Sequence, residues 1–267
     1  MQEQFAIILA NEPGVIEGGV EPLHDMRVAI RRLRTLLRAL APACGGISAE
    51  RMGERFDRLQ KALGPARDAD VLIGILESKA VCRILEGLHA REEVLEKQRA
   101  LLEQRKETVR TLVSGALYRR LKNDAARFIE AGCPAQGFDR PKLRKQALAA
   151  LRKAMDRVRR RSVMPASCPP DAIHALRIAC RRARYLCEFF GPDLGTSVSA
   201  LGQRLKTIQD VLGDVHDLDV LVSELENEHV AVPAALLRAF REKRKRLLRT
   251  FRREWARQGD WTADAWA

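Results

Sequence analysis

Apolar residues recur every three or four positions along almost the whole chain, in segments that are rich in Ala, Leu, Arg and Glu. This spacing places the apolar side chains on one face of an α-helix, and these residue types have high helix propensity. We find no segment with the strict alternation of apolar and polar residues that a half-buried strand requires. The sequence therefore predicts an all-α protein.

Clusters of Gly and Pro divide this pattern into separate helices. The first helix is expected to end at Asn11, where Asn11-Glu12-Pro13-Gly14 interrupts the pattern, and the second has Pro22 in its first turn. The expected helices cover residues 2–11, 21–42, 48–63, 68–85, 88–131, 139–161, 171–190, 196–212, 217–228 and 233–258.

Two sequence patterns occur twice. The pattern H-x2-R-x3-R-R-x-R begins at His24 and again, 150 residues later, at His174. The block L-G-x-x-[R/H]-D-x-D-V-L begins at Leu63 and again, 149 residues later, at Leu212. Because two separate patterns agree in their offset within one residue, they indicate an internal duplication.

The duplication predicts two halves, with the junction in the Gly- and Pro-containing stretch 132–137. The first helical repeat would cover residues 1–136 and the second 137–267. Each half contains about four helices with one more, and four-helix units with short loops form up-and-down bundles. We therefore expect two four-helix-bundle-like halves related by a pseudo-twofold axis.

Each copy of the first pattern forms a row of basic side chains. A helix turns by about 100° per residue, so apolar residues fall on one face and the basic residues on the other. The first basic row consists of His24, Arg27, Arg31, Arg34 and Arg38, and the second of His174, Arg177, Arg181 and Arg184. Glu188 replaces Arg38 in the second row, which is therefore shorter, and Arg32 and Arg182 point towards a flank.

Arginine offers a planar fork of donors that suits phosphate oxygens, so a row of arginines suits a linear polyphosphate better than a single small anion. The chain carries 48 Lys and Arg against 35 Asp and Glu, a net charge of +13, which favours polyanions such as nucleic acid, polyphosphate or an acidic membrane surface. The alternative is a solvated basic face, which the repetition of the same face makes less plausible. Aromatic residues are only 5% of the chain, which counts mildly against a binder of single-stranded nucleic acid.

The string Leu23-His24-Asp25-Met26-Arg27-Val28-Ala29-Ile30-Arg31-Arg32-Leu33-Arg34, its second copy and the two Asp-containing blocks resemble the CHAD domain family, which is named for a characteristic histidine in an α-helical domain. The resemblance covers nearly the whole chain. It implies a duplicated helical bundle with a central basic groove or pore, binding of inorganic polyphosphate without catalysis, and association with polyphosphate granules. The chain departs from symmetry where Arg67 stands opposite His216.

The candidate polyphosphate-binding residues are the two basic rows, together with Arg152 and Arg159, which share a helix face and extend the groove. Asp68 and Asp217 follow a Gly and are expected to open a helix. They act either as N-caps or as supporting carboxylates that aim the arginines, and the two roles are compatible.

Two other functions remain alternatives. A nucleic-acid-binding protein would also be basic, although no recognised nucleic-acid-reading motif is present. A metal-dependent phosphohydrolase would need several His and Asp ligands, and His24-Asp25 and His216-Asp217 resemble such pairs. The arginines around His24 and His174 repel a cation, so we predict no metal and no cofactor.

Three further sequence features bear on the cellular location of the protein. No apolar run approaches the roughly 20 residues that span a bilayer, and no signal peptide is recognised. The six cysteines form no C-x-x-C motif, so we expect buried thiols in a reducing compartment. The expected location is the cytoplasm, with no membrane partner, and the sequence predicts no oligomeric state.

Overall fold

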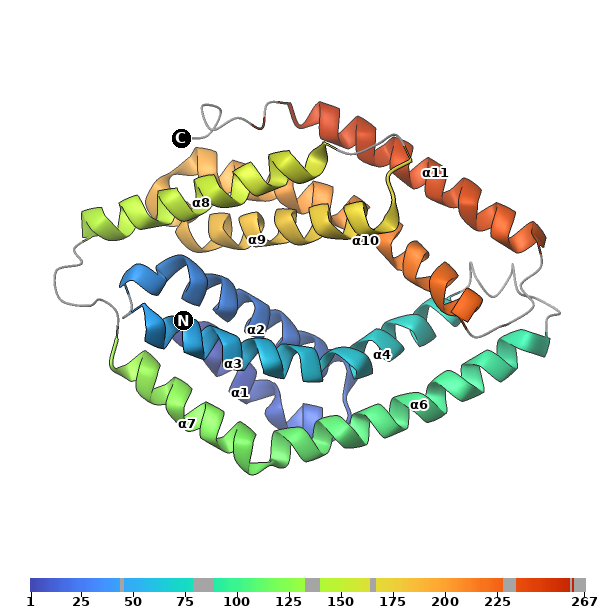
Figure 1. Ribbon diagram of the computed structural model, residues 1–267, viewed down its shortest axis with the longest axis horizontal. Helices are drawn as coiled ribbons and strands as arrows, with labels where there is room; N and C mark the ends of the chain where they lie inside the picture. Colours follow the sequence, from blue (N-terminus) through green and yellow to red (C-terminus); the bar gives the residue numbers. More distant parts are fainter. Residues whose placement is uncertain are drawn as a thin grey trace. The chain divides into compact units, whose positions relative to one another are not determined.

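The computed structural model describes residues 1–43, 46–78, 89–132, 140–163, 167–227, 234–259 and 261, and every regular element among them is helical (Figure 1). The prediction of an all-α protein is confirmed. The elements are α1 (Gln2–Ile16), α2 (Val20–Leu40), the 3-10 helix η1 (Ala41–Ala43), α3 (Ile47–Ala62), α4 (Gly64–Leu76), α6 (His89–Ser114), α7 (Ala116–Glu130), α8 (Arg140–Ser162), α9 (Pro170–Leu194), α10 (Thr196–Asn227) and α11 (Ala234–Arg257). No described helix combines the length and apolar character needed to cross a membrane.

The chain divides into two compact units, Met1–Leu143 and Arg144–Ala267. Apart from Gly132, the predicted junction at 132–137 lies outside the described residues. The predicted halves 1–136 and 137–267 therefore stay a prediction.

In the first unit, α2 packs against α1 and α3, and α4 packs against α6. The predicted apolar face of α2 supplies the centre of the core, where Met26 and Ile30 are fully buried. Phe56 of α3 and Val113 of α6 belong to the same cluster. Burying each large apolar side chain contributes about 1.5–3 kcal/mol, so this face fixes the side of α2 that remains available for the basic row.

Helix α1 continues past Pro13, which corrects the predicted end at Asn11. The helix ends instead at Ile16, and the chain turns at Gly18, whose φ of 85° is left-handed. The Gly18 amide donates to the Val15 carbonyl, and the Gly19 amide to the Gly14 carbonyl at 2.8 Å. These two hydrogen bonds satisfy the last carbonyls of the helix. Gly14 also allows Pro22 to approach, because a Cβ there would lie 2.5 Å from Pro22 Cγ.

The predicted single helix over 88–131 is wrong, because α6 and α7 are separate helices that meet at Gly115. Gly115 has the extended dihedrals φ −79° and ψ 163°. A Cβ at this position would lie 3.0 Å from the Thr111 carbonyl oxygen. A side chain here would therefore press against the last turn of α6, which favours glycine at this position.

In the second unit, α9 and α10 lie alongside one another and α11 packs against α10 (Figure 1). Ile173, Cys180 and Ala183 of α9 are fully buried, as are Ile208 and Leu212 of α10. Cys168, Cys180 and Cys187 are buried free thiols, as expected, and burial raises the pKa of Cys180 to about 12.

Helix α10 runs without a break through Leu212, Gly213 and Asp214, which corrects the two predicted helices 196–212 and 217–228. In the first unit the corresponding block is divided at Leu63, between α3 and α4. A residue that accounts for this difference is Pro65, where the second block has Asp214. Proline lacks the amide hydrogen that a helix interior uses and therefore favours the first turn, as in α4, although α1 accommodates Pro13 in its interior.

Candidate anion-binding site

Arg27 of the first basic row lies against the start of α4. Its guanidinium donates from Nη1 to the Gln60 carbonyl at 3.2 Å, and its Nη2 lies 4.0 Å from Asp68 Oδ1. The side chain is only 12% exposed. Burial, opposed in part by Asp68, lowers the pKa of Arg27 to about 10, so the residue still carries its charge at neutral pH.

Gly64 makes room for this guanidinium. A Cβ built on Gly64 would lie 3.3 Å from Arg27 Nη1. At the corresponding place in the second unit, a Cβ on Gly213 would lie 3.7 Å from Arg177 Nε. The glycine of each L-G block therefore lies next to the first arginine of a basic row.

The charges of Arg31 and Arg67 act on both Arg27 and His24. Burial lowers the pKa of His24, and the charges of Arg67 and Arg31 lower it further. The same two arginines lower the pKa of Arg27. Within the part of the chain that the structure describes, Nε of Arg31 is buried and has no hydrogen-bond partner. We call His24, Arg27, Arg31 and Arg67 the first basic cluster.

The later members of the first row differ from the cluster. Arg34 forms an ion pair with Asp57, which Lys61 also contacts at 3.0 Å. The Lys61 hydrogen bond and the charges of Arg34 and Arg38 lower the pKa of Asp57. Arg34 is thus largely neutralised, whereas Arg38 is exposed at the end of α2.

The second unit contains a matching group, the second basic cluster, which consists of His174, Arg177, Arg181 and His216. The rings of His174 and His216 are tilted by 47° with centroids 4.7 Å apart. Burial lowers the pKa of His216 to about 4, and the charges of Arg177, His174 and Arg181 act in the same direction. Burial and the same two arginines lower the pKa of His174.

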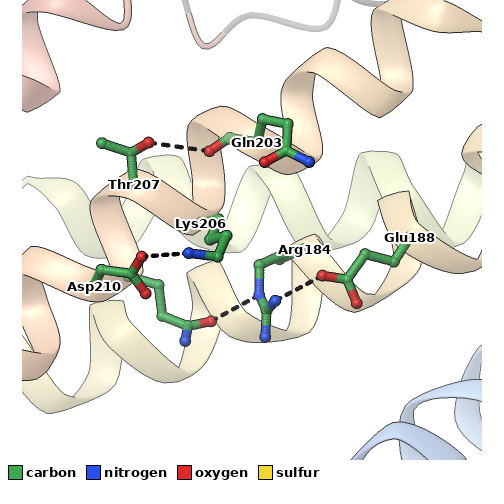
Figure 2. Close-up of polar contacts among 7 residues, drawn as sticks. Arg184, Glu188, Gln203, Lys206, Thr207 and Asp210 are labelled. Carbon is green, nitrogen blue, oxygen red and sulfur yellow. Dashed lines mark hydrogen bonds and ion pairs between the residues drawn. The ribbon is translucent and has the colours of Figure 1, made fainter.

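Arg184, the last member of the second row, is held by other side chains. Figure 2 shows its guanidinium directed at Glu188, with Nη1 2.6 Å from the carboxylate. Its Nε donates to Gln209 Oε1 at 3.1 Å. Glu188 therefore does more than shorten the row, because it also neutralises Arg184.

The N-capping interpretation of the paired aspartates is wrong. Helix α4 begins at Gly64, so Asp68 lies in its second turn, and Asp217 lies in the interior of α10. Asp68 Oδ1 lies 4.0 Å from Arg27 Nη2 and its side chain is 73% exposed, and the supporting role of Asp68 and Asp217 stays a prediction. Asp219 has a structural contact instead, because it accepts from Arg244 Nε at 2.5 Å and from Arg244 Nη2 at 3.1 Å.

Arg152 and Arg159 both lie on α8, beside an apolar face that includes Leu151 and Met155. Arg152 is exposed, whereas Arg159 forms an ion pair with Asp156 one turn earlier. Their predicted role in extending a groove stays a prediction. Among the described side chains, no three of His, Cys, Asp and Glu gather in a group that could hold a metal ion.

Sequence reasoning did not assign Arg67 and His216 to the site. Both occupy the same position of the L-G-x-x-[R/H]-D-x-D block, three residues after the glycine that lies next to an arginine. Their sequence signal was a departure from symmetry. In space, each completes a cluster of four basic side chains with a histidine and two arginines from the preceding pattern.

The family model of the CHAD domain matches residues 1–226. The crystal structure of the CHAD domain from the plant Ricinus communis shares 26% sequence identity and has a TM-score of 0.68, over 92% of this chain and 81% of that chain. No curated protein matches this sequence. The family resemblance of the sequence is thereby confirmed.

Proposed function

Since this chain belongs to the CHAD domain family, we propose that it binds inorganic polyphosphate through its two basic clusters and does not hydrolyse it. The clusters supply guanidinium and imidazole donors, the groups that recognise phosphoryl oxygens. Arg38, Arg152 and Arg159 are further candidate contacts, and Asp68 and Asp217 are supporting carboxylates. Association with polyphosphate granules is part of the same proposal.

The observation that carries the proposal is the concentration of positive charge around Arg31. The charges of Arg31 and Arg67 act on both His24 and Arg27. The carboxylate of Asp68 lies 4.0 Å from Arg27 and is mostly exposed. The positive charges of these arginines repel one another. In addition, the buried Nε of Arg31 lacks an acceptor among the described residues. A bound polyanion would offset both costs.

The matching second cluster supports an internal duplication. Arg27 beside Gly64 corresponds to Arg177 beside Gly213, at offsets that the sequence repeat predicts. Two clusters of the same composition suit a ligand with many equivalent phosphates better than a single phosphate ion. The shared central groove stays a prediction.

The test replaces Arg31, which has no carboxylate partner among the described residues, with Glu. A hydrogen bond to a charged group contributes about 1.5–3 kcal/mol, so Arg31→Glu should weaken binding of long-chain polyphosphate roughly tenfold to a hundredfold. Arg51→Glu is the matched control, because Arg51 is exposed near the start of α3 and the charge change is identical. Affinity is measured by calorimetry at fixed salt, and again across a salt series.

Equal losses in the two variants would show that only net charge matters and that the cluster is not the site. Binding should weaken with salt, because polyanion contacts release counterions, and Arg31→Glu should make this dependence shallower by about one unit in the log–log slope. Competition between polyphosphate and duplex DNA for the protein tests the nucleic-acid alternative, and a preference for DNA would favour that alternative. Phosphate release with added Mg²⁺ or Mn²⁺ would establish the hydrolase alternative.

A further inference from the structure

The second basic cluster contains two titratable rings where the first contains one. His174 on α9 and His216 on α10 are close enough for ring contact, with centroids 4.7 Å apart. His216 is partly buried, whereas His174 is exposed, so a ligand has access to the pair. The corresponding residues of the first cluster are His24 and Arg67, whose guanidinium is always charged.

The charged groups around the two rings are mainly positive. Arg177 and Arg181 of α9 act on both rings, and Asp171, near the start of α9, opposes them at His174. On α10, Asp217 follows His216 directly in the sequence, and Asp219 is engaged by Arg244 of α11. Protonating either imidazole therefore adds charge to an already positive cluster, which keeps the free rings neutral near pH 7.

We propose that His216 joins His174 in contacting the phosphate chain, and that the pair takes up protons when the chain binds. This inference rests on the proposed function and assigns His216 a role in it. A neutral imidazole can donate one hydrogen bond, whereas the protonated ring donates from both nitrogens and attracts the anion electrostatically. Phosphoryl oxygens beside the rings offset the repulsion from Arg177 and Arg181, so binding and protonation favour each other.

The two clusters then respond differently to pH. Arg67 keeps its charge over the whole physiological range, whereas His216 gains charge only when an anion is present or the pH is low. The affinity for polyphosphate should rise as the pH falls, because binding couples to proton uptake. Each proton taken up changes the affinity by up to about tenfold per pH unit.

The experiment measures affinity for long-chain polyphosphate between pH 8 and pH 5 at constant ionic strength. Terminal phosphates titrate near pH ~6, but interior phosphates stay ionised, so a long chain has nearly constant charge. His216→Arg gives the second cluster the arginine that the first cluster has at this position. It should reduce the slope of log affinity against pH by up to about one log unit per pH unit. The reciprocal Arg67→His should steepen it, both because a titrating ring is added and because a charge that lowers the pKa of His24 is removed.

A second measurement needs no substitution in the protein that is titrated. NMR titration of the histidine rings should show the pKa of His216 rising when polyphosphate is added, with resonances assigned from the His216→Arg spectrum. Binding with the same pH slope in wild type and His216→Arg, or an unchanged His216 titration, would overturn this inference and leave the proposed function intact. Absence of polyphosphate binding at every pH would overturn both.

Discussion

Gly64 and Gly213 offer a matched pair of substitutions that tests whether a glycine is needed beside the first arginine of each cluster. Both occupy the same position of the repeated block, but the space around them differs. At Gly213 a new Cβ would lie 3.7 Å from Arg177 Nε, which is an ordinary contact. At Gly64 it would lie 3.3 Å from Arg27 Nη1, so the guanidinium must move by a few tenths of an ångström.

The two alanine variants should therefore change stability in opposite directions. Replacing glycine with alanine inside a helix stabilises it by about 0.5–1 kcal/mol, which is the expectation for Gly213→Ala in the middle of α10. Arg27 already donates to the Gln60 carbonyl at 3.2 Å, the long end of the normal range. Losing this charged hydrogen bond costs about 1.5–3 kcal/mol, so Gly64→Ala should be destabilising by about 0.5–2.5 kcal/mol.

Urea denaturation gives both free energies of unfolding, and polyphosphate titration gives the affinities. Gly74→Ala is the control, because a Cβ at Gly74, also on α4, would meet nothing within 4 Å. Gly74→Ala and Gly213→Ala should both be stabilising, with unchanged affinity for Gly74→Ala. If Gly64→Ala were as stable as these two variants and bound polyphosphate like wild type, the dependence of Arg27 on Gly64 would be refuted.

Three further predictions concern stability. Asp219→Ala should destabilise the second unit by about 3–5 kcal/mol, because Asp219 is only 10% exposed and its removal leaves the Arg244 guanidinium without this carboxylate. Thermal or urea unfolding measures the change, and a loss below about 1 kcal/mol, which is typical of an exposed ion pair, would contradict the prediction. Met155→Ala should cost about 2–5 kcal/mol, since Met155 is fully buried on α8, whereas the exposed Arg152→Ala on the same helix should stay within about 0.5 kcal/mol. The free energy of unfolding should fall as the pH drops from 6.5 towards 4, because His216 is protonated in the unfolded chain but stays neutral in the folded protein. His216→Gln should flatten this part of the pH profile, and an unchanged slope would contradict the prediction.

The sequence predicted α2 closely because its apolar period is strong and is opposed by a polar face. The structure begins this helix at Val20 and ends it at Leu40, against an expected range of 21–42. Buried Met26, Ile30 and Leu33 then fix how the helix is rotated, so the side of the basic row followed directly from the pattern. Tertiary packing added little to this part of the prediction.

The ends of helices were harder to predict, because Gly and Pro affect a helix differently according to their surroundings. Pro13 was expected to interrupt α1, but the helix ends at Ile16, where the Gly18 and Gly19 amides satisfy its last carbonyls. Gly115 was expected to lie inside a helix, yet it divides α6 from α7. Gly213 was expected to follow the end of a helix, yet α10 continues through it. At the end of α1 and at Gly115 the deciding factor was a backbone hydrogen bond or a close contact that residue type alone does not show, whereas α10 continues where Asp214 replaces the proline of the first block.

The composition of the site was also only partly predictable. A helical wheel placed Arg34 and Arg184 in line with the other basic residues, but it contains no information about neighbouring helices. Asp57 of α3 neutralises Arg34, and Gln209 of α10 together with Glu188 engages Arg184. Sequence periodicity identifies which side chains share a face, whereas carboxylates on the adjoining helix, and Glu188 on the same helix, determine which of them keep an available charge.

Within the repeated block, some positions are constrained by packing and another varies between the two units. Leu63 and Leu212 are both fully buried, and the adjacent Gly64 and Gly213 both lie next to an arginine, so these two positions are constrained by packing. The position three residues after the glycine has no such constraint, since it holds Arg67 in one unit and His216 in the other. A guanidinium and an imidazole share little in shape, but both can donate hydrogen bonds as cations. What this position retains is therefore the capacity for positive charge, which is the property that an anion would select.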